Sequence, residues 1–241
     1  MKAMIFAAGL GTRLKPLTDT IPKALVPIAG KPLLQHQLER LHQSGFDDVV
    51  VNVHHFADMI EQWCSDHSYN NIHFSDERAY LLETGGGIKH AAPLLREETN
   101  KENHFLIHNV DILSNVDLKN FWQAGQRFEA QLLVSERTTQ RYLLFDDDLR
   151  LVGWTNIKTG EVKTPYADLH VEACHKLAFA GIHMMHTSLL PLMEEWPEKF
   201  SIIDFYLTIC MNHDIRGFIQ PNLRLMDVGK IDTIQEAEQF V

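Results

Sequence analysis

Over its first 135 residues the chain alternates short apolar segments with segments of helical periodicity. Strands are expected at residues 2–7, 48–53, 71–75, 105–107 and 131–135, and helices at residues 32–44, 56–64, 85–95 and 118–128. A strand, a helix and a second strand in succession form a right-handed crossover in a parallel sheet, with helices on both faces. The pattern therefore predicts an α/β fold of three layers, αβα, with a mainly parallel central sheet.

The second half of the chain has a different pattern. A hairpin is expected at residues 142–156, an irregular mobile loop at 158–173 and a strand at 178–185. Further helices are expected at residues 188–196, 201–211 and 232–240, and short strands at 215–219 and 224–226. No repeat or linker-like segment divides the chain, so we expect a single domain over residues 1–241.

Composition argues against several classes of protein. Of the 241 residues, 32 are acidic and 22 basic, a formal net charge of −10, whereas a nucleic-acid binder usually has a basic excess. Cys64, Cys174 and Cys210 form no CxxC pair, which indicates free thiols in a reducing compartment. No apolar run approaches the roughly 20 residues of a membrane helix. We therefore expect a cytoplasmic protein that binds neither nucleic acid nor membrane.

Basic residues are concentrated at the start of the chain. Residues 1–31 contain one acidic residue, Asp19, together with the basic residues Lys2, Arg13, Lys15, Lys23 and Lys31. A small basic segment on an acidic protein indicates a local site for an anionic small molecule.

The turn after the first strand is a candidate phosphate loop. Gly9 and Gly11 allow a ligand to approach the backbone, whose successive N–H groups can hold phosphate oxygens. Arg13 can pair with two phosphate oxygens at once. A dinucleotide fingerprint would require a third glycine where Leu14 stands, and the GxxxxGK[ST] pattern of a P-loop does not occur. We therefore expect a phosphate loop of another kind.

A lysine follows in a stiff segment. Pro22 and Pro27 restrain the backbone around Lys23. A lysine held near a phosphate loop can neutralise the charge that develops during phosphoryl transfer. An isolated lysine would be interpreted as a solvated surface residue, so this hypothesis depends on the neighbouring loop.

Together these two segments resemble a known family. The pattern A-A-G-x-G-T-R-L at residues 7–14, followed by P-K-x-L-x-P-x-x-G-K-P at residues 22–32, resembles the opening of the sugar-1-phosphate nucleotidylyltransferases, or NDP-sugar pyrophosphorylases. The resemblance spans the whole chain and implies a Rossmann-like three-layer αβα nucleotidyltransferase fold. It implies a nucleotide-binding half at residues 1–135, and a half at residues 136–241 that binds the sugar and completes the pocket.

Within the family, the compact length and residues 82–88 are most similar to N-acetylmuramate 1-phosphate uridylyltransferases. Small mannose-1-phosphate guanylyltransferase-like proteins are close rivals.

The resemblance assigns roles to individual residues. The nucleoside triphosphate would be bound by Ala8, Gly9, Gly11, Thr12, Arg13, Glu83, Gly85, Gly86 and Asn109. The sugar 1-phosphate would be bound by Lys23, Thr84, Gly181 and Asp204. Arg13 and Lys23 would be the catalytic residues, which stabilise the reacting phosphates. Plainer interpretations stay open: a helix-opening turn for Gly85 and Gly86, a core strand for Gly181, and a solvated helix face for Asp204.

Two aspartates are expected to bind Mg²⁺. The family has a metal-binding aspartate at the position of Asp111. Asp227 supplies the second carboxylate, because residues 227–230 resemble the late D-V-G-T segment of the family. Mg²⁺ prefers oxygen ligands and is commonly held by one or two carboxylates plus substrate phosphates. The family pattern has glycine and threonine where this chain has Val110 and Lys230. Either aspartate is otherwise interpreted as an ordinary turn residue.

The implied reaction joins a nucleoside triphosphate to a sugar 1-phosphate and releases pyrophosphate, with Mg²⁺ as cofactor. UTP and N-acetylmuramate 1-phosphate are the favoured substrates. The alternatives are guanylyl transfer to mannose 1-phosphate or another hexose or heptose 1-phosphate, and cytidylyl transfer to phosphocholine. Because Val110 and Lys230 depart from the family pattern, a non-catalytic sensor of nucleotide sugars also stays open. A monomer or a homodimer is expected.

Overall fold

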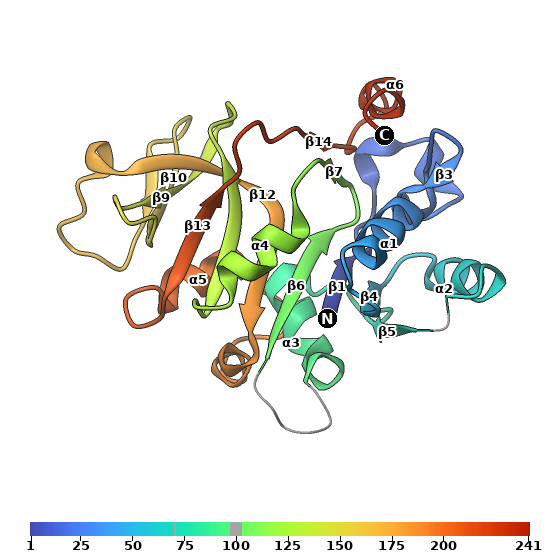
Figure 1. Cartoon of the computed structure of the whole chain (residues 1–241), viewed down its shortest axis with the longest axis horizontal. Helices are drawn as coiled ribbons and strands as arrows, with labels where there is room; N and C mark the ends of the chain where they lie inside the picture. The colour runs from blue at the N-terminus through green and yellow to red at the C-terminus, as the bar shows by residue number, and fades with distance from the viewer. Residues whose placement is uncertain (70, 97–102) are drawn as a thin grey trace.

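A ten-stranded sheet forms the centre of the molecule (Figure 1). The computed structural model describes residues 1–69, 71–96 and 103–241. The strands lie in the order β11-β10-β9-β12-β6-β1-β4-β5, with β8 paired to β12 and β13 beside this path. Their bounds are β1 (Lys2–Phe6), β4 (Asp48–Val53), β5 (Ile72–Asp76), β6 (His104–Asn109), β8 (Ala130–Ser135), β9 (Arg141–Phe145), β10 (Leu151–Asn156), β11 (Glu161–Lys163), β12 (His175–His186) and β13 (Ile215–Ile219).

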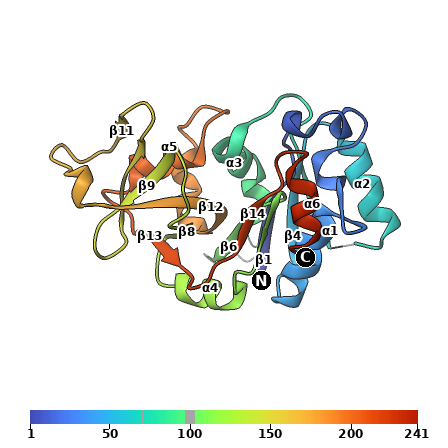
Figure 2. The ribbon, with the colours of Figure 1, turned by 90° about the horizontal axis from the view of Figure 1, so that it is seen from above.

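Helices cover both faces of this sheet. One apolar cluster includes residues of α1 (Leu33–Gln43), α2 (Ala57–Asp66), α4 (Leu118–Gly125) and α6 (Thr233–Glu238). The other cluster includes residues of α3 (Glu83–Leu95) and α5 (Ile202–Ile209). Figure 2 shows the strands of the second half, β8 to β11, at one end of the molecule and α1 and α2 at the other. The predicted three-layer α/β fold is confirmed.

The residues of β1 show that the central sheet is buried on both faces. Side chains alternate between the faces of a strand. Ala3 and Ile5 accordingly pack into the α1 cluster, whereas Met4 packs into the α3 cluster, and none of the three is exposed. An uninterrupted apolar run is therefore required here, because neither face of β1 contacts water.

The parallel strands β1, β4 and β6 have their carboxyl ends at the same edge of the sheet. β1 pairs in parallel with β4 on one side and with β6 on the other. Phe6 and Asn109, the last residues of β1 and β6, lie opposite each other. Successive crossovers run from β1 to β4 and β5, and the chain then returns to β6 on the far side of β1. Ligands of such sheets bind at this switch point, outside the carboxyl ends of the strands.

The second half extends the sheet with antiparallel strands. β12 pairs antiparallel with β6, β8 and β9, and β13 pairs in parallel with β8. The ladder between β12 and β8 shifts register between Phe179 and His183, where Gly181 has a φ of 74°. The predicted strands are present here, but their directions follow from long-range pairing.

Two segments differ from the sequence-based expectation. The helix predicted at residues 188–196 is instead two short 3₁₀ turns, Thr187–Leu189 and Pro191–Met193. Pro191 has no N–H to donate to the preceding turn, so an α-helix cannot run through it. The segment predicted to be an irregular loop contains strand β11 and a 3₁₀ turn at Val171–Ala173.

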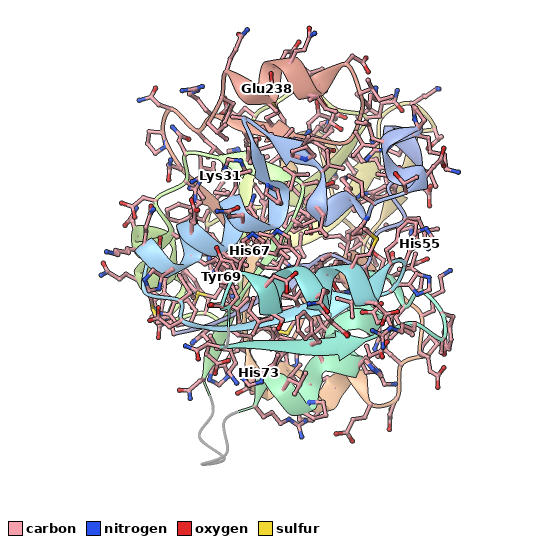
Figure 3. The ribbon with its side chains drawn as sticks, turned by 90° about the vertical axis from the view of Figure 1, so that its right-hand side faces the viewer. Lys31, His55, His67, Tyr69, His73 and Glu238 are labelled. Carbon is pink, nitrogen blue, oxygen red and sulfur yellow. The ribbon has the colours of Figure 1, made fainter. Side chains whose placement is uncertain are left out.

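Helix α2 ends in an aromatic stack at one edge of the molecule. The rings of His67 and Tyr69 lie 4.4 Å and 5.4 Å from the ring of Trp63, centroid to centroid. Figure 3 shows His67 and Tyr69 at this end of α2 and His55 near its start. These histidines are therefore separated by the length of the helix.

Within residues 1–69, 71–96 and 103–241, no helix is both long and apolar enough to span a bilayer. The three cysteines are free thiols, as predicted, and Cys64 and Cys210 are buried.

Candidate functional site

A cavity of about 230 Å³ lies at the carboxyl ends of β1 and β6. We call it the β1–β6 cavity. It is lined by Phe6, Ala7, Ala8, Gly9, Lys23, Asn52, Glu77, Leu81, Glu83, Thr84, Asn109, Val110 and Asp111. The sequence predicts Ala8, Gly9, Lys23, Glu83, Thr84, Asn109 and Asp111 as binding residues, and the fold brings these together from four separate segments of the chain.

The glycine loop has a conformation that depends on Gly11. Its φ is +63°, and a Cβ atom would lie 2.9 Å from Cγ2 of Thr18 and 3.2 Å from Cβ of Lys23. The Thr18 hydroxyl donates a hydrogen bond to the Gly11 carbonyl over 2.8 Å. A side chain at position 11 would therefore separate the loop from the segment that carries Lys23.

Asn52 at the end of β4 anchors the start of the loop, a role that the sequence analysis missed. Its Oδ1 accepts hydrogen bonds from the N–H groups of Ala7, at 2.7 Å, and Ala8, at 3.3 Å. Its Nδ2 donates to Oε1 of Glu77 over 2.7 Å. Asn52 and Glu77 are each only 2% exposed. Burial raises the pKa of Glu77, and the hydrogen bond from Asn52 opposes that rise.

Lys23 and Asp111, which both line the β1–β6 cavity, form an ion pair. A 3₁₀ turn at Lys23–Leu25 begins directly after Pro22. Nζ of Lys23 donates to Oδ2 of Asp111, and the two side chains are 11% and 18% exposed. Lys23 and Asp111, which the sequence predicts from two separate motifs, thus pair with each other where little solvent reaches them.

The second aspartate is brought to the first by a short antiparallel ladder. β14 (Leu225–Asp227) pairs with β7 (Ile112–Ser114), so that Asp227 lies opposite Ile112. The N–H of Val228 donates to the Asp111 carbonyl over 2.8 Å. Asp111 and Asp227 therefore come from distant parts of the sequence but occupy neighbouring positions.

The pKa of Asp227 is affected by the nearby Asp111. Desolvation by the surrounding protein and the negative charge of Asp111 raise the pKa of Asp227, while the positive charges of Lys23, Arg13 and Arg137 lower it. Arg13 also reaches this segment, because a Cβ atom on Gly229 would lie 2.8 Å from its Nη2. Asp111, Asp227, Lys23 and Arg13 thus lie in one region beside the glycine loop.

The departures from the family pattern lie in different surroundings. Val110 is 3% exposed and packs in the α1 cluster while it also lines the β1–β6 cavity. Its N–H donates to the Phe6 carbonyl over 3.2 Å, which continues the β1–β6 pairing. Lys230 is exposed, and its carbonyl accepts from the Thr233 hydroxyl over 2.7 Å.

Gly85 and Gly86 have a packing role in this structure. Both N–H groups donate to the Phe200 carbonyl, over 2.9 Å and 3.2 Å. A Cβ atom would lie 2.3 Å from the Phe200 ring at Gly85 and 2.0 Å from the Glu198 carbonyl oxygen at Gly86. Neither glycine lines the β1–β6 cavity, unlike the preceding Glu83 and Thr84. The binding of nucleotide by Gly85 and Gly86 therefore stays a prediction, now beside an observed packing role.

A second cavity of about 550 Å³ lies between the β9–β11 strands and α5. We call it the β9–α5 cavity; it includes Arg137, Arg141, Trp154, Lys163, Phe179 and Asp204. The predicted sugar residue Asp204 lies here, and its Oδ1 is 3.0 Å from Nζ of Lys163.

Gly181 lies where the two cavities approach each other. A Cβ atom on it would lie 2.7 Å from Nδ2 of Asn109, which lines the β1–β6 cavity. Phe179, two residues earlier on β12, lines the β9–α5 cavity. The absence of a side chain at Gly181 thus permits the close approach of β12 to the end of β6.

The first part of the chain matches a known protein family. The nucleotidyl transferase family matches residues 2–141, more than half of the chain. The chain belongs to this family. The family resemblance predicted from the two opening motifs is thereby confirmed.

Several relatives of the chain have names that state an activity. An N-acetylmuramate alpha-1-phosphate uridylyltransferase of Caulobacter vibrioides is 52% identical over 99 residues, 39% of this chain and 41% of the relative. One of Neisseria meningitidis is 46% identical over 127 residues, 52% of this chain and 53% of the relative. The chain thus spans about half the length of these relatives, or less. A mannose-1-phosphate guanyltransferase of Gibberella zeae is 35% identical over 240 residues, 95% of this chain and 61% of the relative.

Several solved structures share the fold. HddC from Yersinia pseudotuberculosis, complexed with GMP-PN, has a TM-score of 0.76 at 23% identity, covering 99% of this chain and 98% of that one. The inositol-1-phosphate CTP transferase of T. maritima has a TM-score of 0.74 at 17% identity, covering 99% and 94%. At these identities the likeness shows the fold alone.

Proposed function

We propose that this protein transfers a nucleotidyl group from a nucleoside triphosphate to a sugar 1-phosphate and releases pyrophosphate. The observation that carries the proposal is the meeting of two aspartates, a lysine and an arginine beside a glycine loop at the sheet's switch point. Triphosphates are strongly anionic, and a glycine loop with adjacent basic side chains suits them. The β1–β6 cavity and the β9–α5 cavity, which approach each other near Gly181, supply room for a donor and an acceptor.

The proposed reaction needs no protein nucleophile. A phosphate oxygen of the sugar 1-phosphate forms a bond to the α-phosphorus, and the bond from that phosphorus to the oxygen of the departing pyrophosphate breaks. The attacking phosphate is already ionised at neutral pH. Catalysis is then mainly the positioning of the two substrates and the stabilisation of charge. Lys23 would neutralise the reacting phosphates, and Arg13 would hold the outer phosphates of the donor.

The residues present fit a Mg²⁺ ion. Asp111 and Asp227 offer carboxylate oxygens in adjoining positions, the ligand type that this hard cation prefers. No group of three or more His, Cys, Asp or Glu within the described ranges is arranged to hold a metal, so substrate phosphates would complete the coordination. When bound, Mg²⁺ would supply positive charge to the phosphate oxygens. Lys23 forms an ion pair with one of these two aspartates, Asp111.

UTP and N-acetylmuramate 1-phosphate are the substrates that we favour. Support comes from the two uridylyltransferases, which share 52% and 46% identity with stretches of this chain. GTP with mannose 1-phosphate is the second candidate, because the guanyltransferase match extends over 95% of the chain. We further propose that the protein acts in the cytoplasm, as a monomer or a homodimer, without nucleic acid.

The test is pyrophosphate release with Mg²⁺, in which UTP, GTP, CTP and dTTP are each combined with a panel of sugar 1-phosphates and with phosphocholine. We expect release that depends on Mg²⁺ and on one preferred pair. Binding of a nucleotide sugar without turnover of any pair would instead favour a sensor. Failure of all turnover and all nucleotide binding would contradict both functions.

Asn52→Ala is expected to weaken binding of the nucleoside triphosphate about tenfold, as the loss of two loop-ordering hydrogen bonds implies. The N–H groups of Ala7 and Ala8 would lose their acceptor, so the loop would no longer be held in one position. Titration calorimetry with UTP and with GTP measures the change. Asn71→Ala, at an exposed asparagine before β5, is the matched control. Equal dissociation constants for Asn52→Ala and the unchanged protein would contradict the anchoring role.

A further inference from the structure

Helix α1 carries a polar residue in the middle of its buried face. The leucines of this face, Leu33, Leu34, Leu38 and Leu41, are each at most 5% exposed and pack in the α1 cluster. Gln37 lies four residues after Leu33 and four before Leu41, so it projects from the same face, and it is 2% exposed. A buried amide costs free energy unless hydrogen bonds replace those it made to water. Gln37 therefore needs partners in the segment that covers this face.

The partners of Gln37 are the carbonyl groups on either side of Asp111. Its Nε2 donates to the Ile112 carbonyl over 2.8 Å and to the Val110 carbonyl over 3.4 Å. Val110 and Ile112 also pack in the α1 cluster, so α1 contacts residues 110–112 through both apolar and polar groups. We call these three residues the Asp111 turn. The amide of Gln37 thus holds both neighbours of a residue that we propose to bind Mg²⁺.

Backbone groups hold the Asp111 turn from two other directions. The N–H of Val110 donates to the Phe6 carbonyl of β1 over 3.2 Å, and the N–H of Val228 donates to the Asp111 carbonyl over 2.8 Å. The turn is therefore tied to β1, to the segment after β14 and to α1. Of these three contacts, the one to α1 is made by a side chain, so a substitution at Gln37 removes it without changing the sheet.

A cation held by two carboxylates depends on where each carboxylate lies. Asp227 is the last residue of β14, whereas Asp111 precedes β7, so their relative position depends on how the Asp111 turn is held. Mg²⁺ demands near-ideal octahedral geometry. Groups that orient metal ligands commonly contribute about 10- to 100-fold to metal affinity or activity. A tether on this turn therefore bears directly on the proposed metal site.

We propose that Gln37 is a positioning residue of the Mg²⁺ site, whose amide holds the Asp111 turn so that the carboxylates of Asp111 and Asp227 face one cation. The proposal depends on the proposed function and adds to it a residue that does not line the β1–β6 cavity. Gln37 contacts neither substrate nor metal in this arrangement, and its effect passes through Asp111.

The test is Gln37→Met, which removes the amide but keeps the length of the side chain. We measure the contribution of Mg²⁺ to binding of the preferred nucleoside triphosphate, as the ratio of its calorimetric dissociation constants in EDTA and with Mg²⁺. Gln37→Met is expected to lower this ratio about tenfold and to leave the affinity in EDTA unchanged. The Mg²⁺ concentration that gives half the maximal rate should rise by a similar factor. Gln43→Met, at the exposed last residue of α1, is the matched control and should alter neither quantity.

The fold of Gln37→Met should survive. A cavity of about 190 Å³, lined by Gln37 together with Arg40 and Ser114, leaves room for water near the freed carbonyls. Circular dichroism checks folding, and Gln37→Leu, which matches the leucines of this face, is the second variant if methionine does not fit.

A double variant separates positioning from a general structural role. In an Asp111→Asn background, Gln37→Met should have no further effect on the contribution of Mg²⁺, because Gln37 acts through that carboxylate. A structural role alone would instead weaken triphosphate binding equally in EDTA and with Mg²⁺, and its effect would add to that of Asp111→Asn.

An unchanged contribution of Mg²⁺ in folded Gln37→Met, or an equal loss of affinity with and without the metal, would overturn the proposal. If the unchanged protein binds no triphosphate and turns over no substrate pair, the proposed function fails. Binding of Mn²⁺ alone, followed by the EPR signal of the free ion, then decides the inference. Weaker Mn²⁺ binding by Gln37→Met than by Gln43→Met would sustain it, whereas equal binding, or no binding by any of the proteins, would overturn it.

Discussion

Asp111→Asn is expected to lower the rate of pyrophosphate release about a thousandfold or more, in line with the loss of a metal ligand or a charge-stabilising group at a phosphoryl-transfer site. Asp111 contacts Lys23 directly, and its charge raises the pKa of Asp227. The amide is nearly isosteric but has no charge, so both the proposed Mg²⁺ site and the orientation of Lys23 would be impaired. The fold should survive, because Asp111 is at a strand end and half-buried.

The measurement is a steady-state rate over a range of Mg²⁺ concentrations, with circular dichroism to confirm folding. Asp66→Asn removes the same charge at an exposed residue of α2 and should keep the full rate. Normal turnover by folded Asp111→Asn would remove this residue from the mechanism. Recovery of the rate at high Mg²⁺ would separate weakened metal binding from a failure of the chemical step.

Gly86→Ala is expected to lower the free energy of unfolding by about 2–3 kcal/mol, as overpacking of a tight contact does. A Cβ atom there would lie 2.0 Å from the carbonyl oxygen of Glu198, which is backbone and cannot rotate away. Alanine in a helix is favoured over glycine by about 1 kcal/mol, so a helix-propensity argument alone predicts the opposite sign. The steric term wins because α3 and the segment before α5 are joined by hydrogen bonds at this point.

Urea unfolding monitored by circular dichroism measures the difference. Gly9→Ala is the control, because a Cβ atom at Gly9 would meet nothing within 4 Å, and its free energy of unfolding should stay within about 0.5 kcal/mol of the unchanged protein. A stability of Gly86→Ala equal to or above that of the unchanged protein would show that the Glu198 segment moves freely. In that case the packing role of Gly86 would be wrong.

Local patterns predicted most of the elements for a definite physical reason. β1 and β4 are buried on both faces, so their sequences are apolar runs whose position and length can be read directly. The predicted helix at residues 188–196 was wrong, because apolar spacing carries no information on the N–H that Pro191 lacks.

The candidate site was only partly predictable. Its motif residues stand out because glycines, prolines and a lysine occur in one short stretch. Asn52 and Glu77 were missed, although a lone asparagine in the valine-rich run of residues 49–53 is a signal that could have found them. Their hydrogen bond forms because β4 pairs with β5 in the register that places Val53 opposite Asp76.

The sequence by itself determined where most strands and helices occur along the chain, the position of the phosphate loop and the residue types available for chemistry. Each of these depends on neighbours close along the chain. Only the tertiary structure decided that Lys23 meets Asp111 and that Asp227 lies beside them. Periodicity records whether a side chain is buried, but not which distant group it faces. That information arises when strands pair across the sheet, where hydrogen-bond register fixes the partners.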